Sequence, residues 1–277
     1  MKKIIRKTEV ASGVCEYQVE APLIAESHQA GQFVVLRLHE KGERFPLTIA
    51  KSDTDRGSIT LVVQSAGKST MELNNDFSEG DEIRDLAGPL GNPSEIETYG
   101  DVAVIGGGVG IALIYPVARA LSEAGNRVIS IIGAQSKDKL FYRDKIGEIS
   151  DELVVTTDDG SVGKEGFTSE GFRELLERTR IDKSWAIGPV PMMRACARVA
   201  EEGGTELMVS LNTIMVDGTG MCGGCRVEVD GEAQFACVDG PEFLAESVNF
   251  KLLSQRIETY EEEEECVLER YLEGDDG

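Results

Sequence analysis

Short apolar runs that alternate with polar residues fill the first third of the chain. They are rich in β-branched and aromatic residues and are separated by turn-forming residues. The runs after the basic N-terminal strand are CEYQVEA, QFVVLRL, FPLTIA, SITLVVQ and DEIRDLAGPLG. This rhythm is typical of a small antiparallel barrel or sandwich. We therefore predict a β-barrel domain over residues 1–98.

The hydrophobic pattern changes between residues 99 and 210. Brief, continuous apolar runs at 102–105, 128–132, 153–156, 185–187 and 207–210 are separated by segments with helical periodicity. Continuous apolar strands alternating with helices are typical of a parallel sheet that is covered on both faces. We predict an α/β domain here, and we expect ligands at the carboxyl edge of its sheet.

Neither pattern continues into residues 211–277, which we predict to be a third, smaller unit. Glycines and cysteines dominate as far as Gly240, and a helix is expected from Glu246 through the glutamate run Glu261–Glu265. No internal repeat and no flexible linker is evident.

Composition excludes several classes of function. The 277 residues are 41% hydrophobic and carry a formal net charge of -22, so the molecule would repel a nucleic-acid backbone. The acidity also fits simple solubility or a salty cytoplasm. The uncharged run Val102–Ala118 contains four glycines and Pro116, which argues against a membrane span. The N-terminus lacks the apolar stretch of a signal peptide, so we expect a cytoplasmic protein.

Three of the six cysteines are crowded together and suggest a metal site. Asp217, Cys222, Cys225 and Cys237 have the spacing D-x4-C-x2-C-x11-C, which becomes the plant-type 2Fe-2S spacing if the aspartate is replaced by cysteine. The surrounding glycines permit a loop to wrap a cluster. Structural zinc is the alternative, because three thiolates and a carboxylate also suit a tetrahedral ion. The fourth ligand is predicted to be Asp217, with Cys266 as the rival.

Glycine-rich turns predict binding of a nucleotide. Asp101 to Ala112 is an apolar strand that runs through consecutive glycines into a helix, where backbone N–H groups can receive a pyrophosphate. The match to G-x-G-x-x-G is incomplete, because Ile111 replaces the third glycine, and a plain strand-to-helix turn is the competing interpretation. A second turn, Gly188-Pro189, lies at the same edge of the predicted sheet.

Two segments of the predicted barrel could hold a second anionic group. The strand Arg44-Phe-Pro46-Leu-Thr48 presents a cation, a proline and a hydroxyl, and Gly67-Lys-Ser-Thr70 opens a helix. Taken alone, the first is an ordinary strand with a surface arginine. The two histidines, His28 and His39, are expected at the surface.

Together these motifs resemble the ferredoxin-reductase-like electron-transfer subunits. R-x-P-L-T, G-K-S-T, the turn Gly88–Gly91, G-G-G-V-G-I-A, the sequence Asp158–Ser161, G-P and the cysteine loop occur in the order of that family. Nearly the whole chain is similar to the small subunit of NADH-dependent ferredoxin:NADP oxidoreductase, also called the sulfide dehydrogenase β subunit. The electron-transfer subunit of dihydroorotate dehydrogenase B is the next group. The sequence departs from the wider family's R-x-Y-S motif at Pro46 and Leu47.

The resemblance implies an FAD barrel, an NAD-binding domain and a 2Fe-2S loop domain. It implies that FAD is held by the barrel residues, that NAD(H) binds at the turns of the α/β domain, and that a larger partner subunit with a flavin and 4Fe-4S clusters receives the electrons. The implied cofactor-binding residues are Arg44, Pro46, Leu47, Thr48, Gly67, Ser69, Thr70, Gly106, Gly107, Gly108, Val109, Gly110, Asp158, Asp159, Gly188 and Pro189.

Three functions therefore stay open on the sequence. The first is the NADH-side subunit of a flavin-based ferredoxin:NADP oxidoreductase, and the second is the electron-transfer subunit of a dihydroorotate dehydrogenase or sulfide dehydrogenase. The third is a zinc-stabilised nucleotide-binding scaffold without redox activity. No catalytic acid or base is expected, because hydride transfer depends on alignment of the reactants.

Overall fold

The first ninety residues, in which apolar and polar positions alternate, form a seven-stranded antiparallel sheet that curls into a barrel. The computed structural model describes residues 2–274 and orders these strands β6-β1-β2-β5-β4-β3-β7. The strands are β1 (Lys2–Ala11), β2 (Val14–Glu20), β3 (Phe33–Arg37), β4 (Arg44–Asp53), β5 (Ser58–Gln64), β6 (Glu82–Ile83) and β7 (Asp85–Leu90). The predicted barrel is confirmed.

Two helices close the barrel. The helix α1 (Pro22–Ser27) begins with a proline, and α2 (Lys68–Asp76) begins after Gly67, as the G-K-S-T segment predicts. The buried Tyr17 of β2 donates a hydrogen bond of 2.8 Å from its hydroxyl to the carbonyl of Leu73 in α2. This bond fixes α2 against the barrel core.

The second sheet is the predicted parallel sheet, with strand order β11-β10-β9-β8-β12-β13-β16. All neighbouring pairs are parallel except β13 and β16. The strands are β8 (Asp101–Gly107), β9 (Arg127–Ala134), β10 (Glu152–Thr157), β11 (Lys164–Glu165), β12 (Lys183–Ile187), β13 (Leu207–Ser210) and β16 (Glu242–Leu244). The flanking helices are α3 (Gly110–Glu123), α4 (Arg143–Ile149), α5 (Thr168–Arg178) and α6 (Val190–Gly203).

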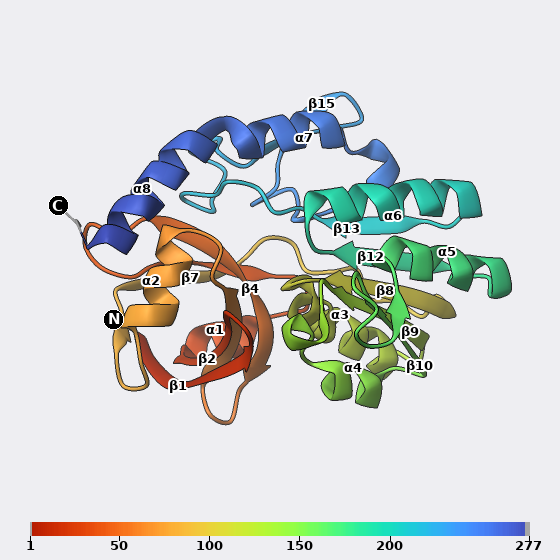
Figure 1. The fold of residues 1–277 in the computed structure, drawn as a ribbon, viewed down its shortest axis with the longest axis horizontal. Coiled ribbons are helices and arrows are strands. Elements are labelled where there is room, and N and C mark those ends of the chain that lie inside the picture. Colours follow the sequence, from red (N-terminus) through yellow and green to blue (C-terminus); the bar gives the residue numbers. More distant parts are fainter. Residues whose placement is uncertain (1, 275–277) are drawn as a thin grey trace.

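The C-terminal segment crosses from the second sheet back to the barrel. It forms the hairpin β14 (Arg226–Val229) and β15 (Glu232–Phe235), and then the helices α7 (Phe250–Ile257) and α8 (Glu261–Glu273). Figure 1 shows α7 and α8 arching over the other two regions, with α8 above α2. The Tyr271 hydroxyl of α8 donates a 2.9 Å hydrogen bond to Asp76 at the end of α2.

One predicted element differs in this segment. The helix expected from Glu246 begins at Phe250, because the side chain of Asn249 caps it by accepting a 3.0 Å hydrogen bond from the Leu252 amide. A 3₁₀ turn, Glu258–Tyr260, then separates it from the glutamate-rich helix. The strand β16 comes after residue 210 in the chain but joins the sheet of residues 99–210 by pairing with β13. The domain boundary at residue 210 stays a prediction.

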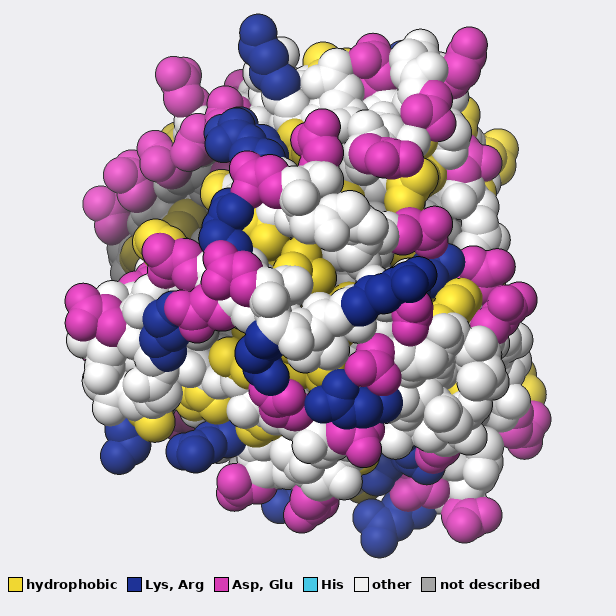
Figure 2. Space-filling model, turned by 90° about the vertical axis from the view of Figure 1, so that its right-hand side faces the viewer, with side chains coloured by type: hydrophobic (Ala, Val, Ile, Leu, Met, Phe, Trp, Pro, Cys, Tyr) yellow, Lys and Arg dark blue, Asp and Glu magenta, His cyan; other side chains and the backbone are white. Residues whose placement is uncertain are grey.

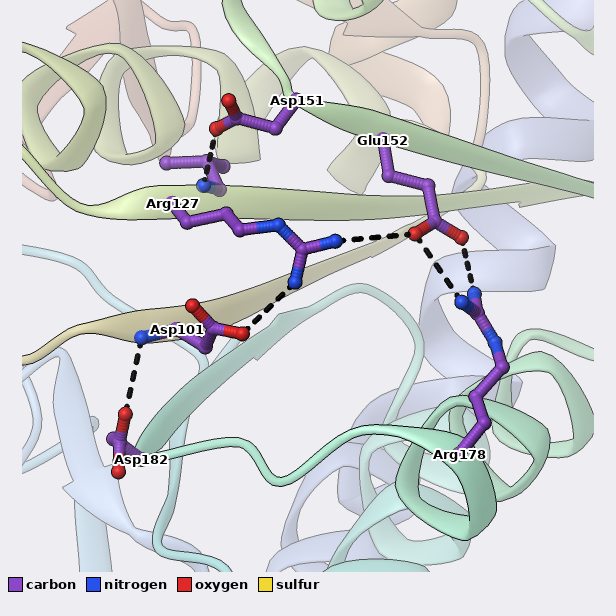
Figure 3. A network of polar contacts seen from close by, with 7 residues as sticks. Asp101, Arg127, Asp151, Glu152, Arg178 and Asp182 are labelled. Carbon is purple, nitrogen blue, oxygen red and sulfur yellow. Dashed lines mark hydrogen bonds and ion pairs between the residues drawn. The ribbon is translucent and has the colours of Figure 1, made fainter.

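Charged residues join the amino ends of the parallel strands. Asp101 and Arg127, which begin β8 and β9, form an ion pair of 2.8 Å, and Arg127 lies 3.7 Å from Glu152, which begins β10 (Figure 3). Glu152 also pairs with Arg178 at the end of α5. Each exposed pair stabilises the fold only slightly. The network lies at the edge of the sheet opposite the carboxyl edge, where ligands are expected.

The surface has no large apolar area on the face that Figure 2 shows. Acidic and basic side chains are interspersed there, and hydrophobic side chains are scattered between them. None of the helices in residues 2–274 has the length and apolar character that crossing a membrane requires.

Candidate functional site: a cofactor cavity and a cysteine loop

A cavity of about 630 Å³ lies between the barrel and the carboxyl edge of the parallel sheet. Its volume is within the range of small-molecule and cofactor sites. Residues of all three regions line it, so the site exists only in the assembled chain. Of the residues implied by the resemblance, the lining includes Pro46, Leu47, Thr48, Thr70, Gly107, Gly108, Val109, Gly110, Asp158, Gly188 and Pro189.

The barrel contributes the strand β4 to one wall of the cavity. Pro46, Leu47 and Thr48 line it, whereas Arg44, at the start of the same strand, is exposed and outside the lining. Glu43, which precedes Arg44, accepts a 2.8 Å hydrogen bond from the Ser69 hydroxyl. This contact places the start of β4 beside the start of α2, so the two predicted anion-binding segments of the barrel are neighbours.

The hydroxyl groups at the start of α2 are already engaged by the protein. Thr70 Oγ1 accepts hydrogen bonds of 3.0 Å from the amides of Ala66 and Gly67, and Ser69 is bonded to Glu43. A phosphate at the first turn of α2 would therefore interact with the positive end of the helix rather than with these two hydroxyls.

The glycine-rich turn after β8 and the turn after β12 pack directly against each other. A Cβ atom at Gly110 would lie 2.0 Å from the carbonyl oxygen of Ile187, so this position accepts only glycine. Gly188 follows Ile187, and Pro189 is the N-cap residue of α6. The two helix starts thus lie side by side at one edge of the sheet, where backbone N–H groups and helix dipoles favour an anionic ligand.

The turn after β10 is tied to the turn after β9. The Ser161 hydroxyl accepts a 2.8 Å hydrogen bond from the Lys137 amide, and Asp159 accepts one of 2.9 Å from the Ser161 amide. Hydrogen bonding by Ser161, chiefly by its side chain and then by its amide, lowers the pKa of Asp159. Asp158 lines the cavity, and Asp159 stands outside its lining. These loops form the wall of the cavity farthest from β13 in the strand order.

The cysteine loop brings two thiols together in the C-terminal region. The sulfurs of Cys225 and Cys237, both buried, are 3.1 Å apart, and the Cys237 amide points at the Cys225 sulfur at 3.5 Å. Cys222 is exposed, and its sulfur receives the Gly224 amide at 3.5 Å. Amide groups aimed at sulfurs are the environment of iron–sulfur ligands, so the donor set fits a cluster. Within residues 2–274, no three His, Cys, Asp or Glu side chains converge as a ready-made metal site.

Asp217 lies on this loop and holds its backbone. Its carboxylate accepts hydrogen bonds of 2.8 Å from the Thr219 amide and 2.7 Å from the Cys222 amide, and the first of these chiefly lowers its pKa. Gly218 has φ +70°, and a Cβ there would lie 2.6 Å from a methyl group of Leu90 in the barrel. The loop is therefore pressed against the barrel.

Comparisons with known proteins agree with this arrangement. Residues 212–249 match the family described as the iron–sulfur cluster binding domain of dihydroorotate dehydrogenase B. A homologue of the electron transfer subunit of dihydroorotate dehydrogenase B from Thermotoga maritima is 49% identical over 98% of this chain and 96% of its own length. The corresponding subunit from Fusobacterium nucleatum is 30% identical over 88% of this chain and 95% of its own.

The chain belongs to the family of dihydroorotate dehydrogenase B electron transfer subunits and their homologues. A solved structure of NADH-dependent reduced ferredoxin-NADP oxidoreductase, described for flavin-based electron bifurcation, has 48% identity and a TM-score of 0.93, with 98% of both chains covered. The predicted fold, the predicted family and the class of electron-transfer oxidoreductase subunit are confirmed. The expected FAD, NAD(H) and iron–sulfur cofactors are confirmed at the level of this family.

Several residues of this family member's cavity were not predicted from the sequence. Asn212 and Thr213 follow β13 at the carboxyl edge, so the rule that selected Gly188 applies to them equally. Phe33, Met192 and Met215 carry no signal beyond hydrophobicity, because apolar residues of this kind are usual in any core. The unpredicted lining includes Phe33, Gln64, Gln135, Lys139, Phe141, Thr168, Met192, Asn212, Thr213, Met215 and Pro241.

The expectation that both histidines lie at the surface is wrong for His28. Its Nε2 atom is buried without a hydrogen-bond partner in residues 2–274, and burial lowers the pKa of the ring to about 4. His28 is the C-cap residue of α1 on the barrel and does not line the cavity. His39 is 45% exposed and lies 2.9 Å from Glu72.

Proposed function

We propose that this chain accepts a hydride from NADH and passes electrons singly to a larger partner subunit, as the NADH-side subunit of a ferredoxin:NADP oxidoreductase. The observation that carries the proposal is the cavity that joins the barrel, the nucleotide turns and the cysteine-loop region. FAD in this cavity, with a 2Fe-2S cluster on the loop, supplies the conversion of an electron pair into single electrons. The chain's own residues bind and orient these groups.

The barrel residues hold FAD in this proposal. Arg44 and the start of α2 bind its phosphates through the amides of Ser69 and Thr70, while Gly67 opens the helix and keeps its own amide bonded to Thr70 Oγ1. Pro46, Leu47 and Thr48 line the cavity and form the surface on which the flavin ring lies.

The turns at the carboxyl edge of the sheet hold NAD(H). The glycines from Gly106 to Gly110 and the pair Gly188-Pro189 receive the pyrophosphate at two adjacent helix starts. Asp158 and Asp159 belong to the loop that closes the far end of the cavity. These turns and this loop align the nicotinamide with the flavin. Hydride transfer depends on that alignment and requires no proton donor.

The cysteine loop holds the cluster through Cys222, Cys225, Cys237 and Asp217. The first three supply the thiolates that iron–sulfur clusters require. Asp217 lies beside Cys222 through its hydrogen bond to the Cys222 amide, which is compatible with a place in the same ligand set. Zinc is the alternative occupant, as the donor atoms alone also suit it.

A partner subunit receives the electrons near the loop. Met221, Val216 and Val238 surround the cysteines with exposed fractions of 88%, 47% and 40%, and exposed apolar side chains of this kind indicate a surface that another protein covers. In the ferredoxin:NADP family the partner carries a second flavin and 4Fe-4S clusters. All six cysteines are unpaired, which supports a reducing, cytoplasmic compartment.

Anaerobic purification of the full chain tests the proposal. Flavin absorption bands and a cluster band that bleaches on addition of NADH are expected. A colourless protein that contains zinc would sink the redox assignment.

The dihydroorotate dehydrogenase B subunit is the second candidate function, and the family match at 212–249 favours it. The identity of the partner subunit distinguishes the two candidate functions. Copurification with a flavin and 4Fe-4S subunit supports the first candidate, and copurification with a dihydroorotate-oxidising subunit supports the second.

A further inference from the structure

The C-terminal helix α8 leaves apolar surface exposed on the face that it turns toward the barrel. Four side chains, spaced by four, three and four residues, share this face: Tyr260, Glu264, Val267 and Tyr271. The face points toward the barrel because Tyr271 hydrogen-bonds to Asp76 of α2. Tyr260 and Val267 nevertheless remain 52% and 37% exposed. Residues 2–274 therefore leave much of this face open to a ligand or a partner.

Two contacts show how α8 lies along α2. Glu264 faces Glu43, since burial and then the charge of Glu43 raise the pKa of Glu264, and Glu43 accepts the hydrogen bond from Ser69 at the start of α2. Seven residues further along each helix, Tyr271 of α8 bonds to Asp76 of α2 at 2.9 Å. The two helices therefore run in the same direction, and Figure 1 shows α8 above α2.

Tyr260 extends this arrangement past the helix start to which the proposed function assigns the flavin phosphates. It precedes Glu264 by four residues, about 6 Å at the helical rise, and so overhangs the first turn of α2. The cavity reaches the same turn from the other side, since Ala66 and Thr70 line it, whereas Arg44 and α8 lie outside its lining. A dinucleotide with its flavin ring in the cavity and its phosphates at this turn must place its adenosine outside the cavity, on the side of α8.

The chemistry of this surface fits adenosine better than a further anion. The charges of Glu43 and Glu261 both act on Glu264, so three carboxylates are close together and repel additional phosphate. Carboxylates instead accept hydrogen bonds from ribose hydroxyls and from the adenine amino group. The exposed side chains of Tyr260 and Val267 offer a flat base an apolar surface for stacking.

We propose that the adenosine end of FAD binds between the first turns of α8 and α2, with its adenine ring stacked on Tyr260. This inference rests on the proposed function, since it requires the FAD phosphates at the start of α2. The helix α8 then holds FAD at the end opposite the flavin ring. The rival occupant of this surface is the partner subunit, because exposed apolar side chains also indicate contacts between proteins.

A comparison of two flavins tests the proposal in the full chain. FMN has the flavin ring and one phosphate of FAD but no adenosine. Tyr260→Ala removes the aromatic ring, and Tyr260→Phe keeps it. Phe167→Ala is the matched control, since Phe167 is an aromatic residue of similar exposure, 61%, that precedes α5 and lies outside the cavity lining. Quenching of flavin fluorescence on titration of the flavin-depleted chain gives the FAD and FMN dissociation constants, and urea unfolding compares the stability of the variants.

The expected loss is specific to FAD. Tyr260→Ala weakens FAD binding by roughly 5- to 100-fold, the range for loss of one stack between a base and an aromatic ring, and leaves FMN binding unchanged. Tyr260→Phe restores the FAD affinity, and Phe167→Ala binds both flavins as wild type does. The urea midpoints of all variants stay close to that of wild type, because both positions are exposed.

Four outcomes would overturn the inference. Wild-type FAD affinity in Tyr260→Ala is the first, and a wild-type chain that binds FAD no more tightly than FMN is the second, because adenosine then contributes nothing. The third is an equal loss of FAD and FMN affinity in Tyr260→Ala, which places the effect on the barrel. The fourth is loss of the copurifying partner with unchanged FAD affinity, which assigns the surface to that subunit. Failure of the wild-type chain to bind any flavin would instead refute the proposed function.

Discussion

Arg44 is the one cation in the barrel motif, and its position is compatible with two different roles. It begins β4, beside the start of α2, and is exposed outside the cavity lining. An exposed arginine next to a helix start can bind the phosphates of a dinucleotide whose ring lies deeper in the cavity. It can also be a surface residue without function. Substitution distinguishes the two roles.

We expect Arg44→Ala to weaken FAD binding by roughly 10- to 100-fold, as a charge-assisted hydrogen bond to phosphate is lost. The cysteine loop belongs to another region, so the iron content of the purified protein should not change. Arg56→Ala is the matched control, since Arg56 is an exposed arginine in the turn between β4 and β5, lies outside the cavity lining, and pairs with Asp53 at 3.7 Å. Full flavin retention in Arg44→Ala would show that the motif is a plain strand.

Asp217 is the residue for which the sequence and the structure suggest different roles. Its spacing matches the first cysteine of plant-type loops, which predicts an iron ligand. In the structure its carboxylate caps the amides of Thr219 and Cys222. Cys266, the rival ligand, is exposed on α8.

We expect Asp217→Cys to keep a 2Fe-2S cluster with a shifted potential and EPR signal, because a thiolate donates more charge to iron than a carboxylate does. Asp217→Ala should make the cluster labile, with loss of iron during gel filtration. Cys266→Ala is the control and should leave the EPR spectrum unchanged. A cluster destroyed by Cys266→Ala and unaffected by Asp217→Ala would refute the carboxylate ligand.

At the level of single residues, the sequence predicts chemistry where the residue type is rare and its spacing is fixed. Cysteines and clustered glycines meet that condition. Thr213 and Met192 do not, since threonine and methionine occur throughout ordinary cores, and their place in the cavity depends on how the second and third regions pack against the barrel. That packing involves residues far apart in the chain and leaves no local pattern.

The loop between β9 and α4 lines the end of the cavity farthest from β13, where the proposed function puts the far end of the nucleotide. Lys139 is one of two lysines in this loop, and it donates a 2.5 Å hydrogen bond to Gln135. Asp138 accepts a 2.6 Å hydrogen bond from Ser136, and this bond chiefly lowers its pKa. Carboxylates of Asp138 and Asp159 thus accompany the lysines in this pair of loops.

We expect NADH to reduce the flavin at least tenfold faster than NADPH, because these carboxylates repel a 2′-phosphate. Stopped-flow absorption of the flavin with each nucleotide measures the preference. Lys137→Ala serves as the control for a hidden phosphate site and should leave the NADH rate within about twofold. A wild-type preference for NADPH that Lys137→Ala abolishes would contradict the expectation.

Elements were predictable to different degrees for a physical reason. The parallel strands are buried on both faces, so their apolar runs stand out from the helices that separate them. The strand β16 has three residues and exists only because it pairs with β13, which lies more than thirty positions earlier. The N-cap Asn249 sets the start of α7 at Phe250, which helical periodicity alone does not predict.

The three regions of the molecule meet around one acidic side chain. Glu242 of β16 accepts a 2.6 Å hydrogen bond from Ser94, in the segment that joins the barrel to the second sheet. A Cβ at Gly31 of the barrel would lie 3.1 Å from the same carboxyl group. Nearby, Lys183 is buried and pairs with Glu95 at 3.1 Å and Glu206 at 2.8 Å. Burial raises the pKa of Glu242, and Ser94 and Lys183 offset part of this increase.

This raised pKa predicts how the stability of the whole chain depends on pH. Between the ordinary carboxyl value of 4.5 and the raised value, the folded state binds a proton at Glu242 that the unfolded state releases. Stability therefore falls as pH rises through this interval, and the cost is constant above it. We expect Glu242→Gln, which keeps a partner for Ser94, to remove this cost.

Urea unfolding of the full chain between pH 4 and pH 8 measures the effect. The midpoint of Glu242→Gln should rise relative to wild type as pH increases from about 4.5, with a constant gain once Glu242 is ionised in the folded state. Glu232→Gln, on the exposed hairpin strand β15, is the control and should follow wild type at every pH. A gain for Glu242→Gln that is equal at pH 4 and pH 8 would mean that packing, and not the buried charge, sets the stability of this junction.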